Sequence, residues 1–253
     1  MSDAGPLIAD PRFYAAALPA AFLVGLSKSG FASGFGALAV PLLALVVPVP
    51  QAAMITLPLL MAADVSGLQR LWRERDPALL RILMPAGLAG LLLGAFTFGL
   101  VSPKSVSALV GALTLLFLAQ RLLFPPRADR PPAGPGMGRL LAVASGFTSF
   151  IAHAGGPPIA AWLLPRRLPP LRLAGTTAVF FAVINVSKIP PYAALGLIDL
   201  RNVLTSLVLI PVTLAGVAIG VWAVRRIDSG WFYRLAYLGM GVAGLKLLWD
   251  GLA

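Results

Sequence analysis

The chain has 253 residues, of which 58% are hydrophobic and 11% charged, and its mean hydropathy is +0.89. A soluble core of this size cannot hide so much apolar surface, so the composition indicates an integral membrane protein. The net charge of +11 comes mostly from basic residues between apolar runs, where membrane orientation explains them, and we expect no nucleic-acid partner. The chain contains no cysteine, which excludes disulfides and thiolate chemistry.

Ten apolar segments follow one another along the chain. They cover residues 13–28, 34–49, 52–71, 82–100, 105–124, 139–153, 155–165, 172–195, 203–224 and 231–249. Six of them approach the roughly 20 residues that a helix needs to cross the hydrocarbon. The segments at 139–153 and 155–165 are shorter, and their lengths suit re-entrant half-helices.

Two glycine-rich motifs interrupt these segments. The first runs from Gly25 to Gly36, and the second runs from Gly146 to Pro158. In a bilayer, such a break in the helix is tolerated only where the backbone faces protein or a water-filled cavity. Paired breaks in the two halves of a chain are typical of a transport site.

A proline- and glycine-rich stretch divides the chain near its middle. Stretches of this composition form loops rather than helices. We therefore predict a first membrane repeat at residues 1–124, a cytoplasmic linker at 125–138 and a second membrane repeat at 139–253.

The two halves also match residue by residue. A shift of 121 places Gly25 on Gly146, and the same shift places Asp64 on Asn185 within matching triplets that end in Val-Ser. A shift of 126 places residues 83–94 on 209–220. A common ancestor or a common constraint explains these matches, and chance alignment of simple apolar helices is the alternative.

The basic residues distinguish two topologies. If the segments made eight full crossings, the lysines and arginines of loops and termini would divide 11 to 7 between the two sides, which is a weak bias. If each motif region is a hairpin that returns to its own side, the arginines of residues 70–81, 121–139, 166–172 and 225–234 share one side. Only Arg12, Lys104, Arg201 and Lys246 then lie opposite. The positive-inside rule therefore predicts an all-α integral membrane protein with two inverted repeats, each a broken or re-entrant helix hairpin plus three transmembrane helices, and with both termini outside.

These features resemble the TauE/SafE family of sulfite and organosulfonate exporters. The resemblance rests on the paired glycine-rich motifs, Pro157 and Pro158, the Asp64 and Asn185 triplets and the proline-containing Leu-Ala-Gly helices, and it spans nearly the whole chain. It implies a multi-pass inner-membrane carrier for sulfur-containing anions such as sulfite or small sulfonates, usually without an ATPase domain. The chain has no phosphate-binding loop of the Gly-x-x-x-x-Gly-Lys-Ser/Thr type, so we expect an ion, proton or substrate gradient, or a separate subunit, to supply the energy.

The motif residues suit an anion. A half-helix that begins inside the membrane directs unpaired N–H groups and the positive end of its dipole toward the break. The candidate backbone donors are Gly34, Gly36, Gly155 and Gly156, and the candidate hydroxyl donors are Ser27, Ser29, Ser33, Thr148 and Ser149. The alternative role of such small residues is helix packing, which we predict for Gly90, Gly94, Gly216 and Gly220.

Three ionisable residues lie where charge is costly, namely Lys28, Asp64 and Lys188. Each would cost roughly 3 kcal/mol or more at the bilayer centre unless it is paired or hydrated, so we expect all three to face the interior. Together they leave one positive charge in excess, which favours an anion. As alternatives, the lysines could snorkel to an interface, or Asp64 could be a static partner of Lys188.

The only histidine, His153, could relay protons or could fill a gap between half-helices. We group the candidates for coupling or for a charge network as Asp64, Ser66, His153, Asn185, Ser187 and Lys188.

We expect no enzymatic activity, no metal site and no cofactor, because the chain offers one histidine, no cysteine and a single clearly embedded carboxylate. The expected partners are a small anionic substrate and the lipid bilayer, and a second copy in a homodimer is a further candidate. An anion channel, or a subunit that anchors a larger complex in the membrane, is the alternative function.

Overall fold

The computed structural model describes residues 6–28, 35–124, 131–223 and 230–253, and these residues form helices and connecting turns without a β-strand. Eleven α-helices and three short 3-10 helices make up this part of the chain. They are α1 Pro11–Lys28, η1 Phe35–Leu38, α2 Ala39–Leu43, α3 Val49–Leu71, η2 Trp72–Glu74, α4 Pro77–Leu100, α5 Pro103–Leu123, α6 Pro135–Ala152, α7 Gly156–Leu163, η3 Leu164–Arg166, α8 Pro170–Ser187, α9 Ile189–Ala194, α10 Leu200–Ala223 and α11 Gly230–Leu252.

Prolines and polar caps determine where several helices begin. Asp76 accepts hydrogen bonds on Oδ1 from the backbone N–H groups of Ala78 and Leu79 at the start of α4. Ser102 caps α5 in the same way. α6 begins at Pro135, inside the stretch predicted as linker, because proline at the first helical position has a helical φ and lacks only an N–H that would be unpaired there.

Among the described residues, five helical segments are long and apolar enough to cross a membrane. They are Val49–Glu74, Pro77–Leu100, Pro103–Leu123, Pro170–Ala194 and Leu200–Trp222. Large apolar side chains cover their outer surface, and Leu100 and Leu200 are each 70% exposed. Apolar side chains so exposed suit contact with lipid, and the all-helical membrane protein predicted from composition is confirmed.

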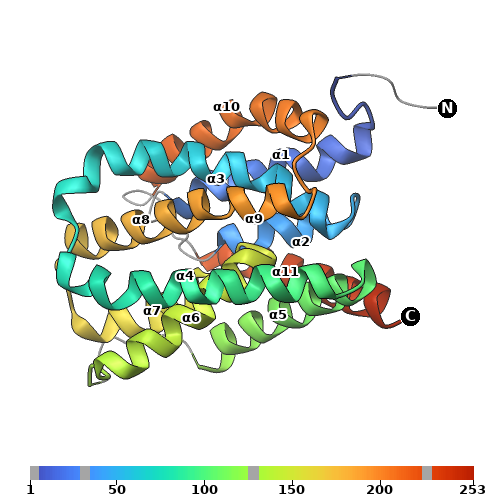
Figure 1. Cartoon of the computed structure of the whole chain (residues 1–253). Helices are drawn as coiled ribbons and strands as arrows, with labels where there is room; N and C mark the ends of the chain where they lie inside the picture. The colour runs from blue at the N-terminus through green and yellow to red at the C-terminus, as the bar shows by residue number, and fades with distance from the viewer. Residues whose placement is uncertain (1–5, 29–34, 125–130, 224–229) are drawn as a thin grey trace.

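The helices lie side by side, and their connections gather at two opposite ends (Figure 1). The turn between α3 and α4 and the connection between α7 and α8 lie at the same end. Asp76 in the first connection donates its backbone N–H to Thr176 Oγ1 at 2.9 Å, and its Oδ2 lies 3.7 Å from Arg172 Nε. Because the arginines of residues 70–81 and 166–172 gather here, we call this the basic end. The hairpin topology predicts that these two connections lie on the same side of the membrane.

Cysteine labelling checks this arrangement in the membrane. Ala78→Cys and Leu171→Cys place single thiols at exposed positions of the basic end, in a chain that has no other cysteine. We expect both to react with a membrane-impermeant reagent only from the cytoplasmic side, whereas Lys104→Cys, in the first turn of α5, should react from the opposite side. Reaction of the first two thiols from different sides would contradict the hairpin topology.

Glycines allow two pairs of helices to cross closely. Gly146 of α6 lies so near α4 that an added Cβ would overlap the carbonyl oxygen of Gly87. Gly25 of α1 lies in the same way against the carbonyl oxygen of Thr213 in α10. Gly25 and Gly146 differ by 121 positions, and Gly87 and Thr213 differ by 126, which are the two shifts found in the sequence. Residues that match between the two halves therefore make both crossings.

The partner helices carry matching glycines. Gly90 of α4 would overlap the carbonyl of Val143 if it gained a Cβ, and Gly216 of α10 would overlap that of Phe22. Gly94 packs against Phe150. The packing role predicted for Gly90, Gly94 and Gly216 is therefore confirmed.

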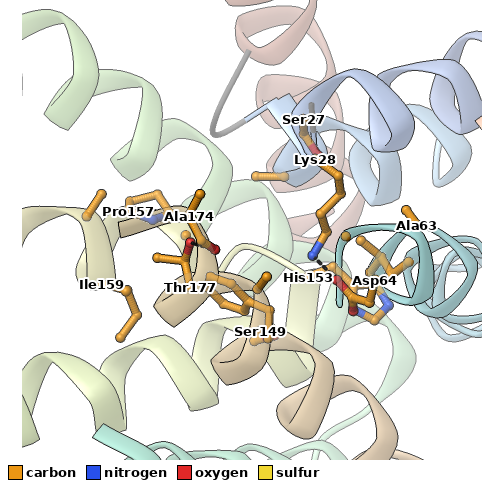
Figure 2. Close-up of a pocket in the computed structure, with 18 of the residues that line it drawn as sticks. Ser27, Lys28, Ala63, Asp64, Ser149, His153, Pro157, Ile159, Ala174 and Thr177 are labelled. Carbon is orange, nitrogen blue, oxygen red and sulfur yellow. Dashed lines mark hydrogen bonds and ion pairs between the residues drawn. The ribbon is translucent and has the colours of Figure 1, made fainter. Parts of the chain in front are cut away.

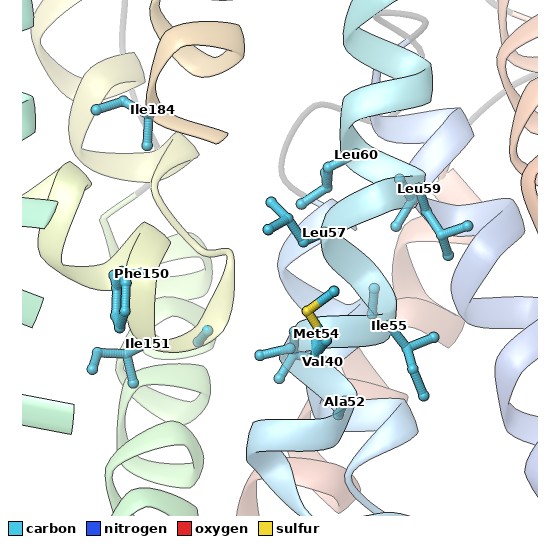
Figure 3. Packing of buried hydrophobic residues seen from close by; sticks show 14 of the residues in the cluster. Val40, Ala52, Met54, Ile55, Leu57, Leu59, Leu60, Phe150, Ile151 and Ile184 are labelled. Carbon is cyan, nitrogen blue, oxygen red and sulfur yellow. The ribbon is translucent and has the colours of Figure 1, made fainter. Parts of the chain in front are cut away.

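The core lies between these crossings and around α3 (Figure 3). Phe150 of α6 is fully buried and contacts Phe98 and Tyr192 edge to face, with ring centroids 5.9 and 5.0 Å away. Tyr192 donates its hydroxyl hydrogen to the Phe150 carbonyl at 3.2 Å. These contacts fix α6 against α4 and α9 close to the break that follows Ala152.

Candidate functional site

The second glycine-rich motif forms a break whose geometry is held by hydrogen bonds. α6 ends at Ala152, and His153 follows in the left-handed conformation with φ of 52°. The backbone N–H of His153 donates to the Ser149 carbonyl, and that of Ala154 donates to the Thr148 carbonyl. This pattern satisfies the last carbonyls of a helix. A left-handed backbone is strained in a residue other than glycine, and His153 adopts it between the two helices.

Gly155 and Gly156 have different environments at the start of α7. Gly155 packs against α6, where Ser145 donates its hydroxyl hydrogen to the Gly155 carbonyl at 2.6 Å. Gly156 has open space where a side chain would lie. Pro157 and Pro158 follow and have no N–H group, so this helix start offers fewer free donors than the motif alone predicted.

A cavity of about 630 Å³ lies beside this break (Figure 2). α1, α3, α5, α6, α7 and α8 all contribute to its lining. Eight of the predicted site residues line it, namely Ser27, Lys28, Gly36, Asp64, Ser149, His153, Gly156 and Asn185. A cavity of this size suits a small organic or inorganic anion with water.

The cavity extends toward the basic end. Leu71, Leu164 and Pro170 line it there, next to the two arginine-containing connections. From α3, its described lining begins at Leu60 and includes no residue of the first half of that helix. We call the end of the cavity at Asp64 and His153 its inner end.

Lys28 is the lysine that lines the cavity. It is the last residue of α1, and its Nζ lies 2.6 Å from Asp64 Oδ1 and 5.3 Å from the centre of the Phe181 ring. The Lys28 side chain is 21% exposed, whereas Asp64 is 4% exposed. A ligand in the cavity can therefore reach the ammonium group more easily than the carboxylate.

Asp64 begins a chain of hydrogen bonds that joins the two halves. Its Oδ2 accepts from Asn185 Nδ2 at 2.7 Å, and Asn185 Oδ1 accepts from Lys188 Nζ at 2.9 Å. Lys188 Nζ lies 2.6 Å from His153 Nδ1, and His153 Nε2 lies 2.9 Å from the Ala53 carbonyl. We call Lys28, Asp64, Asn185, Lys188 and His153 the polar network.

The fold explains how Lys188 enters this network. α8 ends at Ser187, because Pro190 and Pro191 cannot donate the hydrogen bonds that would continue the helix. Lys188 lies between α8 and α9 and is fully buried. Its side chain lies inside the protein and does not extend to the outer surface. Its direct partners are Asn185 and His153, and the ion pair of Asp64 is with Lys28.

Hydroxyl groups complete the described lining. Ser149 is 3% exposed and faces the cavity beside His153 (Figure 2). Ser27 donates to the Val24 carbonyl, and Thr177 donates to the carbonyls of Leu173 and Ala174. Their hydroxyl hydrogens must exchange these acceptors before they can bind an anion.

The remaining predicted site residues lie elsewhere. Ser29, Ser33 and Gly34 lie outside the described residues. Thr148 donates to the carbonyls of Ala144, Ser145 and Ala154, and Ser66 donates to that of Ala63. Within the described lining, the cavity contacts none of Thr148, Gly155, Ser66, Ser187 and Lys188, although Lys188 lies directly behind His153.

Arg121 is a lining residue that the sequence analysis counted only as a topological signal. It lies in the last turn of α5, and its Nε donates to the Tyr237 hydroxyl at 3.2 Å. Gln120, beside it, also lines the cavity. A polar pair at the end of an apolar helix gives a usable signal, but it does not distinguish a cavity from an interface with water.

Comparison with known protein families identifies a match over most of the chain. The family model described as Sulfite exporter TauE/SafE matches residues 17–247 of the 253. No curated protein and no solved structure matches the chain. The matched range includes both motifs and the whole polar network.

Proposed function

The chain belongs to the TauE/SafE family of sulfite exporters and is therefore a multi-pass membrane transporter, and on that premise we propose that it carries sulfite and small sulfonates across the cytoplasmic membrane. The observation that carries this proposal is the position of Lys28. Its ammonium group lies at the inner end of the cavity of about 630 Å³. The other lysine at this end, Lys188, is fully buried and does not line the cavity. A sulfonate or sulfite group presents several oxygens to such a donor.

In the proposed complex, the anion accepts hydrogen bonds from Lys28 Nζ, from the Ser149 hydroxyl and from the backbone N–H of Gly156. All three residues line the cavity. The anion competes with Asp64 for Lys28, because the Asp64 carboxylate holds the same ammonium at 2.6 Å. Lys28 thus has a partner in the empty site and in the occupied site, which avoids an unpaired buried charge.

We also propose that residues 1–124 and 139–253 are two inverted repeats. The matching crossings of Gly25 and Gly146 support this, because each joins a helix of one half to a helix of the other. The hydrogen bond between Asp64 and Asn185 supports it as well, since these residues are equivalent at the shift of 121. A cavity that reaches the basic end is then open to the cytoplasm.

We propose a carrier over a channel, because Asp64 and His153 each bind a residue of the other half of the chain at the inner end of the cavity. A channel needs a path through the layer of Asp64 and His153, whereas a carrier needs only to expose this layer alternately to each side. We propose that transport is coupled to an ion or proton gradient, with Asp64 as the group that takes up the proton. A proton on Asp64 removes the negative partner of Lys28 and frees the ammonium for the anion.

Asp64→Asn tests this coupling. We expect the variant to lose accumulation of sulfite driven by a pH gradient while it retains exchange of internal for external sulfite, because asparagine keeps the shape of aspartate without its proton. Transport into proteoliposomes with and without a pH gradient measures both activities. Full pH-driven accumulation by the variant would assign Asp64 a structural role.

A thermal-shift panel tests the substrate class. Sulfite, thiosulfate, methanesulfonate, sulfate and acetate are added separately to the purified protein. A ligand that binds only the folded state raises the melting temperature by mass action. We expect sulfite and methanesulfonate to raise it more than acetate at equal concentration. Equal shifts for all five salts would contradict a site for sulfur-containing anions.

A further inference from the structure

The polar network sets the charge that the substrate must carry. We infer that the empty site holds one positive charge in excess, and that the transporter therefore selects monoanions such as sulfonates and hydrogensulfite over dianions such as sulfate. A dianion is admitted only together with a proton on Asp64. This inference rests on the proposed function and concerns the same site.

The first part of the charge count is the pair of Lys28 and Asp64. Their charged atoms lie 2.6 Å apart, so the ammonium and the carboxylate balance each other. The carboxylate has a further donor in Asn185 Nδ2, which points to ionised Asp64 as the acceptor. This pair contributes no net charge.

The second part is Lys188 with His153. Because His153 Nε2 faces the Ala53 carbonyl, it must carry a hydrogen, which leaves Nδ1 as the acceptor for Lys188 Nζ. If both groups were protonated, two donors would face each other at 2.6 Å. The two residues therefore hold at most one positive charge between them.

The orientation of Asn185 favours the protonated form of Lys188. Its amide N–H donates to Asp64, so its carbonyl oxygen must face Lys188, and Lys188 donates to that oxygen at 2.9 Å. The amide thus directs its negative end at Lys188 and favours the ammonium form. Lys188 is fully buried and has no carboxylate within ion-pair distance among the described residues, so its charge has no direct counter-ion in the empty site.

The surrounding elements add no charge that would change the count at the inner end. Lys28 comes from α1, Asp64 from α3, His153 from the break after α6, and Lys188 from the break after α8. Residues 29–34 contain no ionisable side chain. α5 contributes Arg121, which lines the same cavity from the last turn of the helix and donates to the Tyr237 hydroxyl, so its charge is not counted in the polar network.

The count predicts substrate charge. A bound monoanion makes the site neutral, while a dianion leaves an excess negative charge in a low-dielectric interior, which is unfavourable. A proton on Asp64 restores neutrality for the dianion. Sulfite with one proton on Asp64 and hydrogensulfite with ionised Asp64 then have the same total charge.

Calorimetric titration of the purified full-length protein at neutral pH tests the count, with methanesulfonate as the monoanion and sulfate as the dianion. The wild type should bind methanesulfonate at least about tenfold more tightly than sulfate. Asp64→Asn raises the excess charge and should tighten sulfate binding at least about tenfold. Lys188→Met removes the excess charge and should weaken methanesulfonate binding by a similar factor.

The double variant Asp64→Asn with Lys188→Met provides the matched control. It again has one positive charge, on Lys28, so methanesulfonate binding should return to within about threefold of the wild-type value. A purely structural role of Lys188 predicts no such rescue.

The outcomes separate this inference from the proposed function. If the wild type binds neither anion, both fall. If it binds sulfate as tightly as methanesulfonate, or if Asp64→Asn leaves their ratio unchanged, the charge count is overturned while the transport proposal stands. Should Lys188→Met not fold, the ratio in Asp64→Asn still decides.

Discussion

Gly146→Ala is expected to destabilise the protein by at least about 3 kcal/mol, which corresponds to a decrease in melting temperature on the order of 10 °C. The added methyl group would overlap the carbonyl oxygen of Gly87, and its next neighbours are also backbone atoms of α4. Backbone atoms cannot turn aside as a side chain can, so α4 and α6 must separate. The melting temperature of the purified variant measures the effect, once the variant has been shown to elute as a single species.

Gly136→Ala is the matched control, because it places the same methyl group on the same helix. No atom lies within 4 Å of a Cβ at Gly136. We expect a change of no more than about 0.5 kcal/mol, since the position is exposed in the first turn of α6. Gly25→Ala should resemble Gly146→Ala. Equal melting temperatures for Gly146→Ala and Gly136→Ala would contradict the close crossing of α4 and α6.

Lys28→Met is expected to weaken sulfite or methanesulfonate binding at least about tenfold. The variant removes the only described ammonium that a ligand in the cavity can reach, and it leaves Asp64 with Asn185 alone. Lys28→Arg should restore binding only in part, because a planar guanidinium fits the space beside the Phe181 ring differently from a compact ammonium. Calorimetric titration ranks the three proteins.

A double variant distinguishes a direct ligand from a source of charge. Lys28→Met with Asp64→Asn leaves the charge of Lys188 as the only one in the network, so the excess charge equals that of the wild type. Affinity should nevertheless stay low if Lys28 donates a hydrogen bond to the anion. Recovery of wild-type affinity would mean that Lys28 acts through its charge alone and does not contact the substrate.

Much of the fold could be predicted from the sequence, because hydrophobic length and proline position are local signals. The segments at 139–153 and 155–165 correspond to α6 and α7, and the break between them falls at His153 as the motif indicates. α6 begins at Pro135, earlier than the predicted residue 139, because Pro135 belongs to the helix as well as to the proline-rich stretch. Charge asymmetry also predicted that the two arginine-containing connections share one end.

The pairing within the site could be predicted only in part. The sequence identified Lys28, Asp64, His153, Asn185 and Lys188 as embedded polar residues, and all five meet in one network. Which lysine pairs with Asp64 depends on how α1 and α8 approach α3, and no local signal carries that information. The orientation of Gly155 toward α6 and of Gly156 toward the cavity also depends on tertiary packing.

The central claim is that the cavity at Lys28 carries a sulfur-containing anion across the membrane by alternating exposure. Counterflow in proteoliposomes tests it most directly, with unlabelled sulfite inside and a trace of radiolabelled sulfite outside. We predict that internal sulfite accelerates uptake of the label by the wild-type protein, and that Lys28→Met shows little acceleration although it elutes as a folded protein. Uptake by the wild type that does not respond to internal sulfite, or equal acceleration in Lys28→Met, would contradict this account.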